Sequence, residues 1–572
     1  MNILKNLIIS SAVVVLLTSC DSFLDINPKG KLGDEQLNTA DNIEKLVIAA
    51  YSLVGGDFRR TALWPYSDVR SDDAYKGGGG TGDNAQWNIF ETFVQMRVDL
   101  SDVDLKWYRN YVAVSRANNA LARLHNLSEE EFPKKQIRVA EMRFLRAHQM
   151  FELKLLFKHI PWIDETILAA EYINISNVEY TDKQLWDRLI EEFRFAVNNL
   201  PEQNEDVGRA NKYSAKAYLA KVLLYAAYEQ NEKHEVVSID KTKLEEVVTL
   251  ISELEGRYSL APDFARNFLH EYENGTESVF AVQNSSNDGT PYGMLDQSSM
   301  LTYPMNAEYG CCGFLQPSQN LVNAFKTDEN GLPLFESYNM SDISTSSDLF
   351  EYNIDLRLLH TVAIPGVPFK YNPTFIYERG WSRQPETYGA FLSMKGAVLP
   401  DCSCFQRAGA YMSSSKNRDI IRYDDALLWK AEALIELGRH MEALPIINSI
   451  RLRAQNSSGL LVDVTGNPTA QFKVGEYING ENCNWTQEFA RKALRWERRL
   501  EMALECSRFF DLVRWGDADQ YMNTYFSEEK TKRAHLRDAQ FTKSRDEYFP
   551  IPLAQINFSK KLHKQNYGWP DN

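Results

Sequence analysis

Side chains able to hold a ligand are densest in one segment near the N-terminus, residues 68–87. A sugar offers flat C–H faces and rings of hydroxyl groups, so a site for it needs an aromatic platform edged by planar or charged hydrogen-bonding groups. The run Gly77–Gly80 indicates a loop, and loops carried by a rigid frame commonly hold such groups. The candidate contacts are Asp72, Asp73, Tyr75, Asn84 and Trp87. Trp87 is the strongest of them, with ordinary core packing as the equal alternative.

A second set of candidates lies in the middle of the chain, where prolines, glycines, serines and tyrosines cluster. Any one of these side chains is expected to pack rather than bind, but the set as a whole is expected to include ligand contacts. A disulfide between Cys311 and Cys312 would form a rigid apolar ring able to pack on a sugar face; two small apolar loop residues are the simpler alternative. The set comprises Tyr292, Tyr303, Tyr309, Cys311, Cys312, Trp381, Arg383, Tyr388 and Tyr411.

No sequence pattern is typical of a catalytic or metal site. Gly77, Gly79 and Gly82 match the spacing of a dinucleotide-binding loop, but neither a strand before them nor a helix after them is predicted. Walker A, H-E-x-x-H and G-x-S-x-G sequences are missing from the chain. Cys402 and Cys404 have no companion pair at zinc spacing. We therefore expect no catalytic residue, no metal and no cofactor, although the acidic residues are too numerous for a glycosidase pair to be identified.

The N-terminus indicates export and a lipid anchor. Lys5 precedes the apolar run Leu7–Leu17, which is too short to span a membrane and is typical of a signal peptide. The following Leu17-Thr18-Ser19-Cys20 resembles a bacterial lipobox, so we expect residues 1–19 to be removed and Cys20 to be lipidated. An ordinary signal peptide is the alternative. The mature chain is expected to be anchored to a membrane without crossing it.

The charge balance excludes one large class of partner. The net charge of −15 leaves no basic stripe to neutralise phosphates, so nucleic acid is not an expected partner. The same balance argues against adsorption onto anionic lipid.

Helical periodicity dominates both ends of the chain. It predicts helices over residues 102–125, 135–157, 181–199, 212–229 and 241–254, then from 420 to 452, and one last helix over 486–514. Residues 437–444 resemble the centre of a tetratricopeptide (TPR) helix pair. The predicted fold is mostly α, with TPR-like helix pairs forming a superhelical scaffold and an irregular, loop-rich ligand-binding region. The predicted regions are 20–256, 257–418 and 419–572, after the signal peptide 1–19.

Several short sequence segments, taken in their order along the chain, resemble those of the SusD/RagB family of Bacteroidetes outer-membrane nutrient-binding lipoproteins. They are residues 140–147, 155–161, 214–225, 422–433, 497–501, 510–516, 549–552 and 566–568. The resemblance implies four TPR-like helix pairs, a cell-surface location on the outer membrane, and a role as lid on a SusC-like TonB-dependent transporter. It also implies a glycan or, in some members, a peptide as cargo, without a catalytic step. In the family, the loop after the first helix often supplies a stacking tryptophan and polar partners.

The charged residues in these family-like segments are expected to stabilise the fold rather than to bind the ligand. These arginines and glutamates lie beside aromatic residues on helices, where buried or half-buried ion pairs are the natural outcome. These residues are Arg143, Arg146, Glu497, Arg498, Arg499 and Arg514.

The functional hypothesis is a glycan-binding lipoprotein that delivers oligosaccharide or polysaccharide to a SusC-like transporter. A fructan such as levan is the specific glycan that we expect from general likeness to family members. Two alternatives stay open: a peptide-binding lid of the same transporter type, and a TPR-like protein-interaction module with no small ligand.

Overall fold

The computed structural model describes residues 38–55, 59–290 and 293–570. The signal segment 1–19, the expected lipidation site Cys20 and the candidate Tyr292 lie outside these ranges. In the described part of the chain, no helix is long and apolar enough to cross a bilayer.

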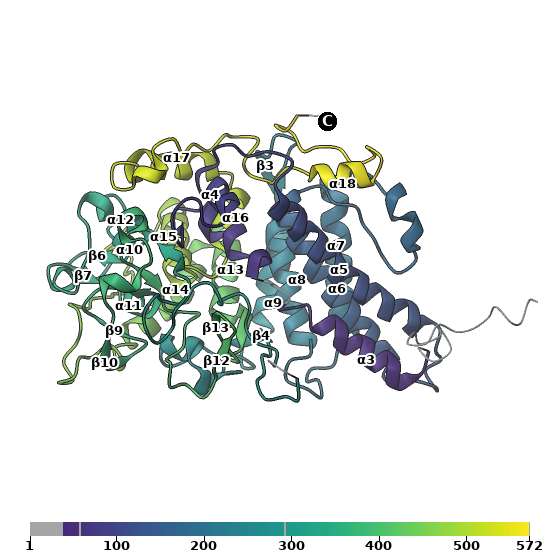
Figure 1. The fold of residues 1–572 in the computed structure, drawn as a ribbon, viewed down its shortest axis with the longest axis horizontal. Coiled ribbons are helices and arrows are strands. Elements are labelled where there is room, and N and C mark those ends of the chain that lie inside the picture. The colour runs from purple at the N-terminus through teal and green to yellow at the C-terminus, as the bar shows by residue number, and fades with distance from the viewer. Residues whose placement is uncertain (1–37, 56–58, 291–292, 571–572) are drawn as a thin grey trace, which may run out of the picture.

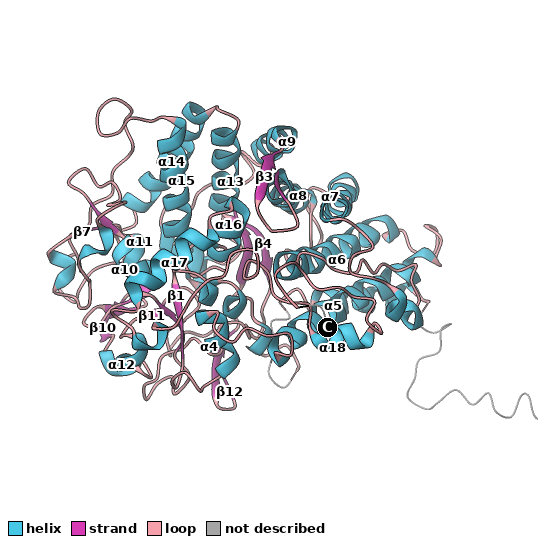
Figure 2. Cartoon of the chain, turned by 90° about the horizontal axis from the view of Figure 1, so that it is seen from above, coloured by secondary structure: helices cyan, strands magenta, loops and turns pink. Residues whose placement is uncertain are grey.

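An array of antiparallel helices forms the frame of the molecule, and each helix packs on the next: α5 on α6, then α7, α8, α9, α13 and α14. Seen from above, these helices follow a curve from α5 to α14 (Figure 2). The array with its flanking helices comprises α3 (Ala40–Tyr51), α4 (Ala85–Thr92), α5 (Ser101–His125), α6 (Lys135–Phe157), α7 (Asp182–Asn199), α8 (Lys212–Ala227), α9 (Lys241–Ser252), α13 (Tyr423–Glu436) and α14 (His440–Gln455).

Helix α7 shows how the sequence produces this frame. Thr181 caps its N-terminus, accepting from the Gln184 amide at 3.2 Å, while the Gln184 side chain accepts from the Thr181 amide at 2.9 Å. Leu185, Leu189 and Phe193 recur at helical spacing and are buried, so one face of the helix packs against its neighbours.

The irregular region interrupts the array between two neighbouring helices, since α9 ends at Ser252 and its packing partner α13 begins at Tyr423. The strand β4 near the start of this region pairs antiparallel with β14 at its end, with Ser278 opposite Arg422. Figure 1 shows the region in green beside the blue helices. Its short helices are α10 (Gln319–Ala324), α11 (Arg357–Thr361) and α12 (Pro385–Tyr388).

The described strands form seven two-stranded antiparallel sheets. They are β1 (Ala74–Gly77), β2 (Tyr228–Gln230), β3 (Val236–Ile239), β4 (Ser278–Val282), β5 (Phe314–Pro317), β6 (Lys326–Thr327), β7 (Asn353–Ile354), β8 (Val362–Ala363), β9 (Pro368–Phe369), β10 (Asn372–Ile376), β11 (Leu392–Ser393), β12 (Phe405–Ala408), β13 (Tyr411–Ser414) and β14 (Arg418–Arg422).

The C-terminal segment differs from the single helix expected over 486–514. Helix α15 ends at Glu501 and α16 begins at Arg508, because Leu504 and Cys506 adopt left-handed backbone angles (φ 62° and 67°) that break the helix. Two further helices follow and run along the top of the molecule in Figure 1. The bounds are α15 (Gln487–Glu501), α16 (Arg508–Trp515), α17 (Ala518–Glu529) and α18 (Leu553–Phe558).

One large hydrophobic core extends from Ile43 to Ile556 and includes residues of all three predicted regions. A smaller core lies within the irregular region and is rich in tyrosine. The predicted division at residues 256 and 418 therefore stays a prediction, since the described regions share most of their core.

The expected structural role of the family arginines is confirmed. Arg146 binds Glu192 at 2.9 Å and Arg514 binds Asp511 at 2.8 Å, both within the interior. Removal of either partner of such a pair would destabilise the fold, because it would leave a buried charge uncompensated.

Candidate functional site

Strand pairing brings two distant loops together. β1 pairs with β5, with Gly77 opposite Phe314, so the glycine loop after β1 lies beside the residues that precede β5. A Cβ on Gly77 would lie 2.4 Å from the carbonyl oxygen of Gly313, and Gly77 has φ 76°. Only glycine fits this close approach.

A buried lysine organises the glycine loop. The Lys76 ammonium donates to the carbonyl oxygens of Gly77 (2.9 Å), Gly80 (2.8 Å) and Asp83 (2.7 Å). Burial lowers the pKa of Lys76 to about 8, while Glu91 and Asp83 favour its charged form. With its three donors satisfied by backbone, Lys76 holds the loop in place and leaves the Asp83 side chain free to point outward.

Arg383 joins this loop to the irregular region. Its guanidinium donates to the Asp83 carboxylate at 2.8 Å, and the two side chains are 38% and 29% exposed. The same carboxylate accepts from the Gly79 amide at 2.8 Å. A Cβ on Gly79 would lie 2.9 Å from the guanidinium carbon, so the arginine lies directly over the loop. The pair therefore presents a donor group and an acceptor group to solvent.

An aromatic platform lies next to the arginine. The half-buried rings of Trp381 and Phe375 have centroids 4.8 Å apart, and Trp381 lies two residues before Arg383. The Trp381 carbonyl accepts from the Met305 amide at 2.8 Å, which fixes the segment before the cysteines against it. Cys311 and Cys312 form a disulfide, with Cys311 half-buried and Cys312 buried.

We call this surface the loop face. It consists of Asp83, Asn84, Cys311, Phe375, Trp381 and Arg383. Asn84, adjacent to Asp83, is half-buried, and its side-chain amide has no hydrogen bond among the described residues. The tyrosine-rich core supports the platform from beneath, because the Tyr309 ring lies 6.3 Å from that of Phe375. Rings, amide, guanidinium and carboxylate together can stack on a sugar and bind its hydroxyl groups.

Comparison with known proteins identifies the family. Residues 276–569 match the profile described as "SusD family", and residues 22–224 match one described as "Starch-binding associating with outer membrane". The first match alone covers just over half of the chain.

The chain belongs to the SusD family. A SusD-like protein of Bacteroides ovatus is 24% identical over 526 residues, which cover 89% of this chain and 82% of that protein. The solved SusD homologue from Bacteroides thetaiotaomicron has a TM-score of 0.68 at 18% identity and covers 93% of this chain and 98% of its own. Surface glycan-binding protein A from the same species, solved in complex with laminarihexaose, has a TM-score of 0.62 at 18% identity, with coverage of 92% and 99%.

These likenesses confirm the expected fold class, a mostly helical SusD-like protein with a TPR-like array and a loop-rich region. They also place this SusD-family chain among proteins that associate with the outer membrane.

Trp87, the strongest candidate from the sequence, is located in the core of this SusD-family protein. Its side chain is fully buried between Trp64 and Phe314, with ring centroids 5.0 and 5.3 Å away. No face of the indole is open to a ligand in this conformation. The alternative of ordinary core packing therefore describes Trp87, and Trp381 replaces it as the proposed platform.

The acidic candidates of the same loop are also buried. Asp72 binds Arg508 through two bonds of 2.8 Å, and Asp73 binds Arg499 at 2.7 Å. Burial would raise the pKa of Asp72, but Arg499 and Arg508 outweigh it and lower that pKa. Both carboxylates are committed to ion pairs, which removes them as hydrogen-bonding partners for a sugar.

Four tyrosine candidates are likewise interior residues. Tyr75 donates to Glu529, and Tyr309 donates to the Val398 carbonyl at 2.7 Å. Tyr303 and Tyr388 are fully buried. Tyr411 is half-buried at the start of β13 and stays a candidate.

The structure thus brings Asn84, Cys311, Trp381 and Arg383 together, and it adds two residues that sequence reasoning missed. Asp83 could have been found, since it lies next to Asn84 in the loop already identified. Phe375 gave no signal, because its role depends on its contact with Trp381. The glycine loop does have a strand before it and a helix after it, contrary to expectation, but β1 pairs antiparallel with β5 and belongs to no parallel nucleotide-binding sheet.

Proposed function

We propose that this chain captures a glycan on the loop face and delivers it, without chemical change, to a SusC-like TonB-dependent transporter. One observation carries the proposal: a half-buried aromatic pair, Trp381 with Phe375, lies near a partly exposed guanidinium–carboxylate pair, Arg383 with Asp83. Stacking on the rings supplies affinity, and the polar pair selects the orientation of the hydroxyl groups.

We consider two classes of glycan as the ligand. Laminarihexaose is bound by a structural neighbour, surface glycan-binding protein A, and a further neighbour is described as a laminarin-binding SusD-like protein. Sequence likeness led us to a fructan such as levan. Both are neutral polymers, so binding by stacking and hydrogen bonds is expected to depend only weakly on salt.

The location that fits this role is the outer face of the outer membrane, with Cys20 carrying the lipid anchor. Support comes from the lipobox-like sequence before Cys20 and from the family match. Mass spectrometry of the chain purified from its cells tests the anchor: the expected mature chain begins at an acylated Cys20, and an unmodified cysteine would contradict it.

Titration calorimetry of residues 21–572, which retain every described residue, tests the glycan role against levan, laminarin, starch, xylan and mannan. We expect saturable binding to one class and at least a tenfold loss of affinity in Trp381→Ala, equivalent to about 1.4 kcal/mol. Trp186→Ala is the matched control, because Trp186 is also half-buried among aromatic rings but lies in α7.

If the folded protein bound none of the glycans in the panel, the result would contradict the proposal and favour a peptide as cargo. Equal binding by wild type and Trp381→Ala would leave the glycan role but move it away from the loop face.

A further inference from the structure

A surface pocket lies between residues 261–278, which follow α9 in the chain, and the start of β14. It has a volume of about 220 Å³, and residues 416–419 form its second side. The antiparallel pairing of β4 with β14 fixes the two sides against each other, with Ala281 opposite Asp419. None of the six residues of the loop face lines this pocket, so it is a separate feature of the molecule.

The outer part of the pocket carries an aromatic ring. Tyr272 is 43% exposed, and the Arg266 guanidinium lies 4.6 Å from the centroid of its ring. Arg266 is itself exposed, and within the described ranges its side chain forms neither a hydrogen bond nor an ion pair. The ring offers a flat apolar surface and the guanidinium offers free donors, a combination that suits a sugar residue.

A carboxylate with an open acceptor lies deeper in the pocket. Asp419 is half-buried, and one of its oxygens accepts from the Ser278 hydroxyl. The other oxygen accepts no hydrogen bond from the described residues. Burial raises the pKa of Asp419 to about 6, while Arg422 and Lys416 favour its charged form from longer range. The free oxygen can therefore accept from a hydroxyl group that enters the pocket.

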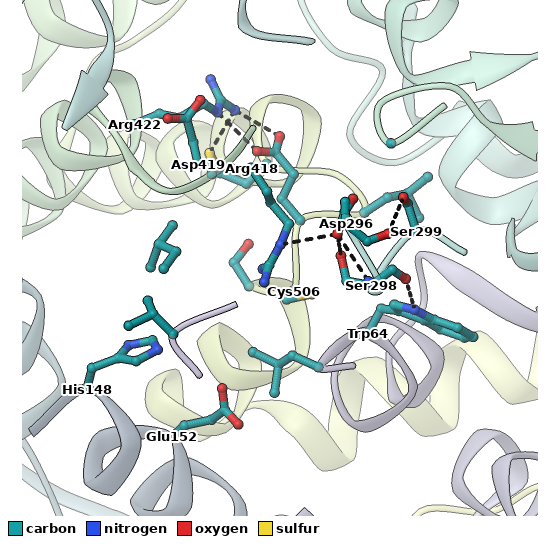
Figure 3. A pocket seen from close by; sticks show the side chains of 18 of the residues that line it. Trp64, His148, Glu152, Asp296, Ser298, Ser299, Arg418, Asp419, Arg422 and Cys506 are labelled. Atoms are coloured by element: carbon teal, nitrogen blue, oxygen red, sulfur yellow. Dashed lines mark hydrogen bonds and ion pairs between the residues drawn. The ribbon is translucent and has the colours of Figure 1, made fainter. Parts of the chain in front are cut away.

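The pocket adjoins a larger interior cavity of about 230 Å³. Figure 3 looks into this cavity and shows Asp419 in its wall, across from His148 and Glu152. Asp419 therefore lies at the boundary between the surface pocket and the interior. The residues that line both spaces are Asn267, Lys416, Asn417 and Asp419.

Hydrogen bonds hold the ring and the carboxylate in fixed positions. Glu273, directly after Tyr272, accepts from the Asn417 amide at 2.7 Å. Asn274 and Gln283 exchange two side-chain hydrogen bonds, of 3.0 and 2.9 Å, and Asn417 also donates to Gln283 at 2.8 Å. These contacts tie the turn after Tyr272 to the end of β4 and the start of β14, so the pocket is formed before a ligand arrives.

Charge and volume restrict the ligand. The cations in the lining, Arg266 and Lys416, balance the anions, Glu273 and Asp419, so the pocket favours a neutral molecule. Its volume lies below the roughly 300–1,000 Å³ of sites for drug-sized ligands, which suits a single sugar residue.

We propose that this pocket is a second sugar site, which holds one residue of a neutral glycan, such as a chain end. The sugar ring packs against Tyr272, and hydroxyl groups bind Asp419 and Arg266. The choice of a glycan as ligand rests on the proposed function, but the position of this site does not depend on the loop face.

The test starts from residues 21–572 with Trp381→Ala, so that the loop face contributes little to binding. The probes are methyl β-D-glucopyranoside and methyl β-D-fructofuranoside, which represent single residues of the two glycan classes considered above. Titration calorimetry is expected to show saturable binding of one of them. Addition of Tyr272→Ala should lower the affinity about tenfold or more, because it removes the stacking surface. Asp419→Asn should also lower it, because an amide oxygen is a weaker acceptor than a carboxylate.

Tyr521→Ala is the matched control and should leave the affinity unchanged. Tyr521 is 37% exposed and has the Arg508 guanidinium 5.2 Å from its ring centroid, but it lies in α17. Both test variants should melt as the starting protein does, because Tyr272 is exposed and Asn at position 419 can still accept from Ser278.

Equal affinity in the starting protein and in both folded variants would overturn the second site, as would the absence of saturable binding of either probe. Neither result bears on the loop face, which is tested separately by the loss of polysaccharide affinity in Trp381→Ala. The two proposals can therefore fail independently.

Discussion

Arg383 binds Asp83 across 300 positions of sequence, with 2.8 Å between guanidinium and carboxylate. The contact joins the glycine loop of the N-terminal region to the irregular region next to the aromatic pair, and it adds a side-chain link to the pairing of β1 with β5. Because both side chains stay partly open to solvent, the contact adds little to stability and much to the shape of the surface.

We therefore predict that Asp83→Asn lowers glycan affinity while leaving the fold almost unchanged. Loss of the ion pair should change the free energy of unfolding by less than about 1 kcal/mol, as for other exposed pairs. Calorimetry with the bound glycan and urea denaturation measure the two effects. Asp187→Asn, in the exposed pair with Lys183, serves as the control and should alter neither.

Trp87→Ala and Trp381→Ala should separate stability from binding. Trp87 is fully buried, so its truncation should cost about 3–5 kcal/mol in the free energy of unfolding. Trp381 is half-buried, so its truncation should cost much less stability and more affinity. A folded Trp87→Ala protein with wild-type stability and no glycan binding would restore Trp87 as the platform.

Lys76→Met should destabilise the protein and loosen the glycine loop. The variant takes the ammonium donor from the carbonyl oxygens of Gly77, Gly80 and Asp83, of which the Gly80 oxygen still accepts from the Asp83 amide at 3.1 Å. Each unsatisfied buried group costs about 1–3 kcal/mol, although water entering the loop would recover part of this. Urea denaturation measures the loss, and faster amide hydrogen exchange at residues 78–84 should accompany it. Unchanged exchange there would contradict the organising role of Lys76.

Asp68 gives a pH dependence with a definite sign. Burial raises its pKa to about 8, with Asp73 adding to the effect and the Cys506 amide opposing it. Between about pH 4 and 8, the native state keeps this proton while the unfolded chain has lost it, so the contribution of Asp68 to stability falls as pH rises. Asp68→Asn should therefore gain stability relative to wild type across this window and level off above pH 8. Urea denaturation at pH 5, 7 and 9 tests this; a constant difference would contradict it.

Arg357→Met should be among the most damaging single changes. Arg357 is fully buried and binds Asp355 at 2.7 Å, Glu497 at 2.5 Å and Glu501 at 2.9 Å. Its loss leaves the buried Asp355 carboxylate without an ion-pair partner, at a cost of about 3–5 kcal/mol. It also removes one partner from Glu497, which keeps Arg451, and one from Glu501, which keeps Arg453. Arg439→Met, which breaks exposed pairs with Glu245 and Glu442, should cost less than about 1 kcal/mol.

The spacing of apolar residues predicted most helices well. The features that it missed depend on backbone angles or on contacts between segments that are distant in sequence. The period over residues 135–157 gave α6 with its observed bounds, because a buried stripe at helical spacing is a local property. The break between α15 and α16 was missed, since left-handed angles at Leu504 and Cys506 leave no mark in apolar spacing.

The site was harder to predict for the same reason. The sequence does not distinguish Trp87 from Trp381, because Trp87 is buried by contacts with Trp64 and Phe314 that depend on the fold. The sequence suggested Asp72 as a ligand contact, but in the structure its carboxylate forms an ion pair with Arg508. Arg383 was identified as a candidate and Asp83 could have been added as the neighbour of Asn84, but the pairing of the two could be recognised only once β1 and β5 were paired.

A crystal structure of the protein with the oligosaccharide that binds best in calorimetry tests the central claim most directly. The account predicts a sugar ring stacked on Trp381, with hydroxyl groups bound by Arg383 or Asp83 and the Cys311–Cys312 ring against the sugar. An oligosaccharide bound elsewhere on the surface, with Trp381 and Arg383 free of contact, would contradict the account.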